Sequence, residues 1–190
     1  MTSSKLPTNE SLNRLIAAIQ DGDDDVRGSA WQDAAPAGAP AIQPLAALFN
    51  HMNFEVVRSA QRAAQRIVRH AGRPGAQPEA QAVEQELLEL LTNGSALVRR
   101  EALGWLSEIG GDAAVAPMAR LLTDPECREE ARCALLRLPS AGVSLVLRDA
   151  MAKAPESFRF ALADALRRRG EQVEGYPSQK LTPTRSTAVR

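Results

Sequence analysis

The residues of this chain best suited to binding chemistry are five arginines that recur every three or four positions. They are Arg58, Arg62, Arg66, Arg69 and Arg73. In an α-helix, where each residue turns by about 100°, they occupy an arc of about 80°. A helix through this segment therefore projects five guanidinium groups from one face. Because guanidinium groups bind carboxylates and phosphates through paired N–H donors, the spacing predicts a site for an anionic ligand.

The surroundings of this arginine stripe leave two interpretations open. No Asp or Glu occurs between Val56 and Pro78, and like charges on adjacent turns repel each other unless an anion neutralises them. One interpretation is a binding face for an acidic protein segment or for the phosphates of a nucleic acid. The predicted helix carries no aromatic residue for base stacking, which weakens the nucleic-acid version. The other interpretation is a solvated face paired with acids of a neighbouring repeat, such as Glu84, Glu86 and Glu89.

Other reactive residue types do not form catalytic or metal-binding patterns. The acidic run from Asp21 to Asp25 lacks the spaced ligands of a calcium loop, and acids before a helix are explained by capping. Cys127 and Cys133 lie six positions apart on one predicted helix and so point to different faces. The two histidines, His51 and His70, have no nucleophile or acid at a catalytic spacing. We therefore expect no enzyme activity, no metal and no cofactor.

A short sequence motif that occurs five times indicates the elements that position the stripe; we call it the repeated phrase. In each case an apolar residue followed by arginine opens a helix after a break. The arginines are Arg27, Arg58, Arg99, Arg128 and Arg159, preceded by Val26, Val57, Val98, Cys127 and Phe158. The phrase returns about every 30 residues, with one step of about 40, and such a period is typical of a solenoid.

The repeats predict an all-α, right-handed α-α superhelix of ten helices in five antiparallel pairs. Two departures stand out. The long step contains an insertion, residues 73–78, and the second helix of the first repeat is cut short by Pro36, Gly38 and Pro40, as expected of a terminal cap. Trp31 in that repeat is expected to cover the open end of the core.

Two segments of the third and fourth repeats carry a family resemblance. The segment Val98-Arg99-Arg100-Glu101-Ala102-Leu103 and the later run from Ile109 to Pro117 are similar to the HEAT-like repeats of the phycobilisome-lyase type. The resemblance covers residues 11–170. It implies an α-α superhelix that serves most often as an interaction scaffold. The family also includes bilin lyases, and some HEAT-like solenoids are DNA glycosylases, but no catalytic residue of either kind is identifiable here.

Composition bounds the remaining possibilities. Of the 190 residues, 44% are apolar but only 4% aromatic, so alanine and leucine must build the core. Lys plus Arg and Asp plus Glu number 23 each. The protein therefore has no net charge that would attract nucleic acid or a membrane surface over long distances. We expect an N-terminal extension at 1–10, a solenoid at 11–170, a disordered tail at 171–190, and a cytoplasmic location. The predicted role is a protein interaction scaffold whose concave surface presents the arginine stripe to an acidic partner.

Overall fold

The computed structural model describes residues 8–177, and within them the chain is helical, with no strand. The ten α-helices are α1 (Asn9–Ile19), α2 (Asp24–Gln32), α3 (Ile42–Ala47), α4 (Phe54–Ala71), α5 (Gln77–Leu90), α6 (Ala96–Ile109), α7 (Asp112–Arg120), α8 (Arg128–Arg137), α9 (Gly142–Lys153) and α10 (Glu156–Arg168). Four short 3₁₀ turns supplement them: η1 (Ala35–Ala37), η2 (Ala39–Ala41), η3 (Leu48–Asn50) and η4 (Leu121–Thr123).

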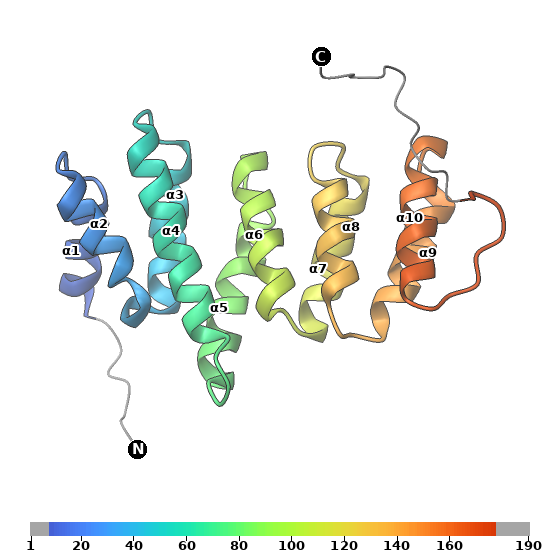
Figure 1. Cartoon of the computed structure of the whole chain (residues 1–190), viewed down its shortest axis with the longest axis horizontal. Helices are drawn as coiled ribbons and strands as arrows, with labels where there is room; N and C mark the ends of the chain where they lie inside the picture. Colours follow the sequence, from blue (N-terminus) through green and yellow to red (C-terminus); the bar gives the residue numbers. More distant parts are fainter. Residues whose placement is uncertain (1–7, 178–190) are drawn as a thin grey trace, which may run out of the picture.

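The helices stack as five consecutive pairs, α1–α2 to α9–α10, each packed against the next (Figure 1). The second helices, α2, α4, α6, α8 and α10, contact one another in order and form one layer. Helices α3, α5, α7 and α9 contact one another in the same way and form the other layer. The predicted α-solenoid of five helix pairs is confirmed.

Helix α4 shows how the apolar pattern produces this packing. Its buried side chains include an apolar set made mostly of alanine: Val56, Ala60, Ala63, Ala64, Ile67 and Ala71. Because most of these side chains are small, neighbouring helices approach closely, and α4 contacts α2, α3, α5 and α6. The face opposite this set carries the arginines. Burial of the alanine face therefore fixes the rotation of α4 about its own axis and turns the arginines outward.

Side-chain caps begin the second helices of the first two repeats. The Asp23 carboxylate accepts hydrogen bonds from the backbone N–H groups of Asp25 and Val26, and the Asn53 side chain accepts one from the N–H of Glu55. These bonds satisfy donors that have no partner within the helix. The acidic run at Asp21–Asp25 thus contains a helix cap, as predicted.

The insertion at residues 73–78 is only partly a loop. Gln77 and Pro78 form the start of α5, where proline is tolerated because its missing N–H has no helical partner. Helix α4 has 18 residues, compared with 9 in α2, and the junction between α4 and α5 projects beyond the neighbouring repeats (Figure 1). The extra length of the second repeat therefore lengthens the helix that carries the arginine stripe.

The chain after α10 differs from the predicted tail at its beginning. Arg167 donates hydrogen bonds to the backbone carbonyls of Val173, Gly175 and Tyr176. The Tyr176 ring packs edge-on against Phe160, with 5.1 Å between centroids. Residues 171–177 therefore fold back on the last repeat. Residues 178–190 of the predicted tail, and residues 1–7 of the predicted extension, lie outside the described part of the chain.

Candidate anion-binding groove

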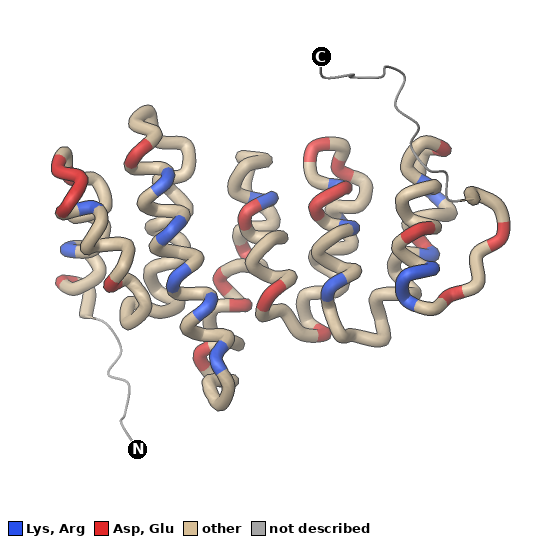
Figure 2. Tube along the Cα trace, in the orientation of Figure 1, with Lys and Arg blue, Asp and Glu red and all other residues tan. Residues whose placement is uncertain are grey.

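All five arginines of the stripe are exposed; Arg58, Arg62, Arg66 and Arg69 lie on one face of α4, and Arg73 lies in the turn that follows the helix. Figure 2 shows the basic positions in a row along this helix. The predicted common face is therefore present, and the local helical period is sufficient to produce it.

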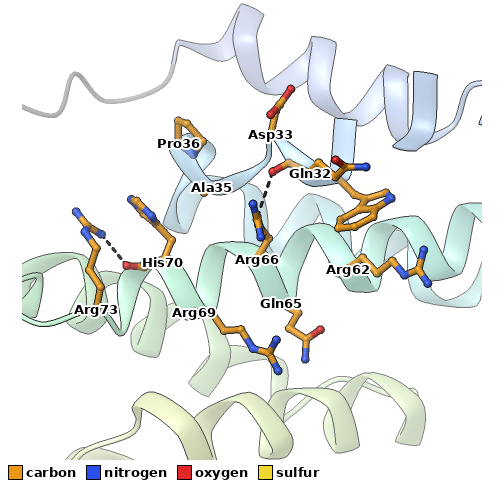
Figure 3. Close-up of a pocket in the computed structure, with 11 residues that line it drawn as sticks. Gln32, Asp33, Ala35, Pro36, Arg62, Gln65, Arg66, Arg69, His70 and Arg73 are labelled. Carbon is orange, nitrogen blue, oxygen red and sulfur yellow. Dashed lines mark hydrogen bonds between the residues drawn. The ribbon is translucent and has the colours of Figure 1, made fainter. Parts of the chain in front are cut away.

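Four of the five arginines line a groove of about 970 Å³ between α4 and the end of the first repeat (Figure 3). Helix α4 contributes Arg62, Gln65, Arg66, Arg69 and His70, and the turn after it contributes Arg73. The opposite wall, formed by the end of α2 and by η1, contributes Trp31, Gln32, Asp33, Ala35 and Pro36. Arg58 does not line this groove. The structure therefore separates Arg58 from the other four arginines of the stripe. We refer to the cavity lined by those four and by the opposite wall as the arginine groove.

Three arginines of the stripe have a carboxylate within ion-pair distance. An oxygen of Glu55 lies 3.4 Å from Arg58, and one of Glu108 lies 3.7 Å from Arg69. Arg73 and Glu79 form a two-bond pair at 2.6 and 2.8 Å. Partners on the stripe's own helix and on α5 and α6 thus neutralise Arg58, Arg69 and Arg73. These partners are not the predicted Glu84, Glu86 and Glu89.

The remaining two arginines, Arg62 and Arg66, have no carboxylate within 4.0 Å among residues 8–177. The Arg62 Cζ atom lies 5.2 Å from the centroid of the Trp31 ring. The Arg66 Nε atom donates a 3.2 Å hydrogen bond to the Gln32 carbonyl (Figure 3). A ring face and a carbonyl orient guanidinium groups without cancelling their charge. Most of their N–H donors remain available to a ligand.

Two further side chains affect the charge of the groove. Asp33 belongs to the opposite wall, but its carboxylate points away from the arginines (Figure 3). Arg69 points away from Pro36 toward α6, in agreement with its pairing to Glu108. Net positive charge in the groove is therefore concentrated at Arg62 and Arg66.

The structure adds Trp31 and Gln32 to the candidate site, which sequence reasoning did not. Trp31 is half-buried and packs against the core, so the expected covering role describes only part of what it does. Its ring also carries Arg62. The shortened first repeat was the one sequence feature that set this region apart. No local sequence pattern relates Trp31 to Arg62, which meet only in the folded protein.

The arginine of the repeated phrase has a structural role in most repeats. Arg27, Arg99 and Arg159 donate to backbone carbonyls in the turn before their own helix. Arg99 also pairs with Asp124 of the next repeat at 3.0 Å. Arg128 lies 4.9 Å from the ring centroid of Phe158, also one repeat further along. Since Arg58 makes only a pair within its own helix, it departs from the other four.

Glu101 and Asp124 are carboxyl groups outside the groove whose pKa values are shifted in opposite directions. Burial raises the pKa of Glu101 on α6, which accepts a 3.1 Å hydrogen bond from Gln61 of α4. The pKa of Asp124 is lowered, first by the backbone N–H of Glu126 and then by Arg99. Both groups lie at contacts between consecutive second helices or their turns, so they bear on stability.

Within the described residues no cluster of three His, Cys, Asp or Glu side chains is arranged to hold a metal ion. Cys127 is buried and Cys133 is exposed, and neither forms a disulfide there. None of the helices in that range combines the length and apolarity needed to cross a membrane.

The fold and the groove define an α-solenoid repeat protein with a basic groove at its N-terminal end. Among solved structures the chain is similar to a designed armadillo repeat protein in complex with the peptide (KR)4, at 20% identity and a TM-score of 0.47, covering 84% of this chain and 82% of that one. It is also similar to two engineered proteins, both at a TM-score of 0.41. One is 22% identical, with 84% and 79% of the two chains covered, and the other is 23% identical, with 83% and 46% covered.

No protein-family model and no curated protein matches the chain. The repeat architecture rests on the helix pairing of the structure itself, and the more specific phycobilisome-lyase-type assignment stays a prediction.

Proposed function

We propose that this chain is a non-enzymatic protein-binding scaffold whose arginine groove binds an acidic segment of a protein partner. One observation carries the proposal: Arg62 and Arg66 are oriented by Trp31 and by the Gln32 carbonyl but have no carboxylate partner among the described residues. Adjacent guanidinium groups on one helix face repel each other. An acidic ligand removes that repulsion and gains charge-assisted hydrogen bonds.

The spacing of Arg62 and Arg66 matches an acidic protein segment in which each guanidinium binds one carboxylate in a two-bond arrangement. The Arg73–Glu79 pair shows this arrangement within the molecule itself. Arg62 and Arg66 lie one helical turn apart, roughly 6 Å along the axis. Alternate residues of an extended peptide are about 6.6 Å apart, so two acidic side chains in an i, i+2 relation match the two arginines.

Nucleic-acid binding is the second candidate, and Trp31 is the observation that favours it. An aromatic ring beside two arginines is the combination that binds single-stranded nucleic acid by stacking and phosphate contact. Arg62, however, lies over the ring of Trp31, where a base would have to stack. Equal numbers of basic and acidic residues also provide no long-range attraction for a polyanion. The acidic protein segment therefore ranks first.

The test compares two double variants that remove the same charge from α4. R62Q/R66Q removes the arginines without carboxylate partners, and the control R58Q/R69Q removes two that have Glu55 and Glu108 nearby. Binding of a fluorescent Glu-Gly-Glu peptide is measured by polarisation at low salt. We expect R62Q/R66Q to weaken binding by at least about tenfold, and the control by less than about threefold.

Two results contradict the proposal. Equal losses in both variants show that only the summed charge of the helix matters, and absence of peptide binding to the wild type removes the acidic ligand altogether. Tighter and more steeply salt-dependent binding of a single-stranded oligonucleotide, lost in R62Q/R66Q, supports the nucleic-acid alternative.

A further inference from the structure

An apolar pocket of about 250 Å³ lies next to the arginine groove. Its walls include Pro36 and Pro40 from the degenerate first repeat, Ile67 and Ala71 from α4, and Ala82 and Val83 from α5. This volume is below the range of about 300–1,000 Å³ that is usual for small-molecule pockets. The pocket therefore suits a single apolar side chain better than a cofactor or metabolite.

The pocket and the arginine groove share part of their lining. Ala35, Pro36 and His70 belong to both. Along α4, the charged part of the groove at Arg62 and Arg66 is followed within two turns by the apolar wall at Ile67 and Ala71. A ligand that contacts the arginines can therefore reach the pocket without leaving this surface.

Charge at the rim of the pocket is already neutralised. Glu79, which also lines the pocket, is held by the two hydrogen bonds from Arg73. The hydrogen bond from Arg73 also lowers the pKa of Glu79. Because this carboxylate is paired, it does not repel an acidic ligand as a free one would.

We infer that the arginine groove and the apolar pocket form one bipartite site for a linear peptide, in which two acidic residues contact Arg62 and Arg66 and an apolar side chain enters the pocket. This inference rests on the proposed function and specifies the partner that the groove selects. Acidic residues alone bind any basic surface, whereas an apolar side chain at a fixed distance from them requires both walls.

The spacing of the peptide follows from the helix that forms the common wall. Arg66 and Ala71 are five residues apart in α4, a rise of roughly 7.5 Å, and Ala71 lies about 140° further around the helix axis. An extended peptide therefore needs about two to four residues to pass from one to the other. The peptide has the pattern acidic-x-acidic, then about one to three residues, then apolar, in one chain direction or the other. The acidic residue nearest the apolar one contacts Arg66, and the other contacts Arg62.

The test uses synthetic peptides with neutral flanks and a fluorophore. The sequences Glu-Gly-Glu-(Gly)n-Leu and Leu-(Gly)n-Glu-Gly-Glu, with n of one, two or three, are compared with versions in which glycine replaces leucine. On the wild-type protein, we expect one leucine peptide to bind about tenfold more tightly than its glycine counterpart. A tenfold lower Kd is the gain expected from burial of one aliphatic side chain.

A matched pair of variants locates the leucine. Ala82 and Gln81 are both exposed on α5, but only Ala82 lines the pocket. A82F, which fills the pocket, should remove the advantage of the leucine peptide, and Q81F should leave it unchanged. Because the comparison of leucine with glycine is also made on the wild-type protein, it does not depend on A82F being folded.

The outcomes separate the inference from the proposed function. Equal binding of leucine and glycine peptides in both chain directions, with both weakened by R62Q/R66Q, overturns the apolar subsite and leaves the acidic groove standing. A leucine advantage that persists in A82F also overturns it, because the side chain then binds elsewhere. If no peptide binds at millimolar concentration, the proposed function fails and the inference fails with it.

Discussion

The guanidinium group of Arg62 on α4 lies over the indole ring of Trp31 on α2, with 5.2 Å between Cζ and the ring centroid. This contact joins the stripe of the second repeat to the shortened first repeat. It orients the arginine through the electrons of a neutral ring, so the positive charge remains available. The neighbouring Arg66 is held to the same wall by the Gln32 carbonyl. The truncated repeat is therefore a wall of the groove as well as a cap.

Replacement of Trp31 should weaken ligand binding without removing any charge. We expect W31L to raise the Kd of an acidic peptide by roughly two- to fivefold, the loss of a partly exposed cation–π contact of about 0.5–1 kcal/mol. W31F, which keeps an aromatic face, should retain most of the affinity. Polarisation with both variants measures this. Binding by W31L at the wild-type level would show that Arg62 does not need the ring for its orientation.

Arg99 and Arg58 occupy equivalent positions of the repeated phrase but should differ in their effect on stability. The Arg99 side chain is 12% exposed, bonds to the carbonyls of Asn93 and Gly94, and pairs with Asp124. R99M should lower the free energy of unfolding by about 2 kcal/mol, and the Tm by roughly 4–8 °C.

Arg58 is the matched control, since it is 46% exposed and pairs only with Glu55 of its own helix. R58M should cost less than about 0.5 kcal/mol. Thermal unfolding followed by circular dichroism distinguishes the two variants. Equal shifts in Tm would mean that the turn before α6 does not depend on Arg99.

Glu101 should make stability depend on pH in the direction opposite to most carboxylates. Burial raises its pKa above the ordinary value of 4.5, so the folded state holds this proton more tightly than the unfolded state. The contribution of the group to stability is therefore present below pH 4.5 and falls as pH rises through the folded-state pKa.

The variant E101Q resembles the protonated side chain and should remove this dependence. We expect E101Q to be more stable than wild type at pH 7 and equally stable near pH 4. The difference between the two proteins, measured by urea unfolding across this range, isolates Glu101 from other carboxyls. A variant that is less stable at pH 7 would show that the Gln61–Glu101 contact requires the charged form.

Arg167 should hold residues 171–177 against the last repeat. It donates to three backbone carbonyls of that segment, whereas the adjacent Arg168 is exposed and pairs with Asp164 one turn before it. R167Q should increase the rate of proteolysis after Glu174 by a glutamate-specific protease at least about tenfold, because the open form of the segment becomes more populated. R168Q is the control and should leave the rate unchanged. Equal cleavage in wild type and R167Q would contradict the role.

The repeat period and the helical period were sufficient to predict much of this protein. The solenoid of five helix pairs follows from the repeat period. The buried alanine face of α4 and the exposed stripe opposite it follow from the helical period. The end of the predicted solenoid differs, because residues 171–177 are held by bonds from Arg167 that no periodicity indicates. Of the predicted insertion at 73–78, residues 73–76 connect α4 to α5 and the last two residues belong to α5.

The sequence by itself determined that Arg58, Arg62, Arg66 and Arg69 share one face of α4, since the angle between residues of a helix is a local property. Only the tertiary structure decided which of them keep their charge available. Glu79 and Glu108 on α5 and α6 reach Arg73 and Arg69, whereas the wall beside Arg62 presents a ring and a carbonyl. The physical reason is that an ion pair requires atoms within a few ångströms of each other. Glu55 and Glu79 lie near Arg58 and Arg73 in the sequence, but packing between distant segments determines what faces the other three arginines.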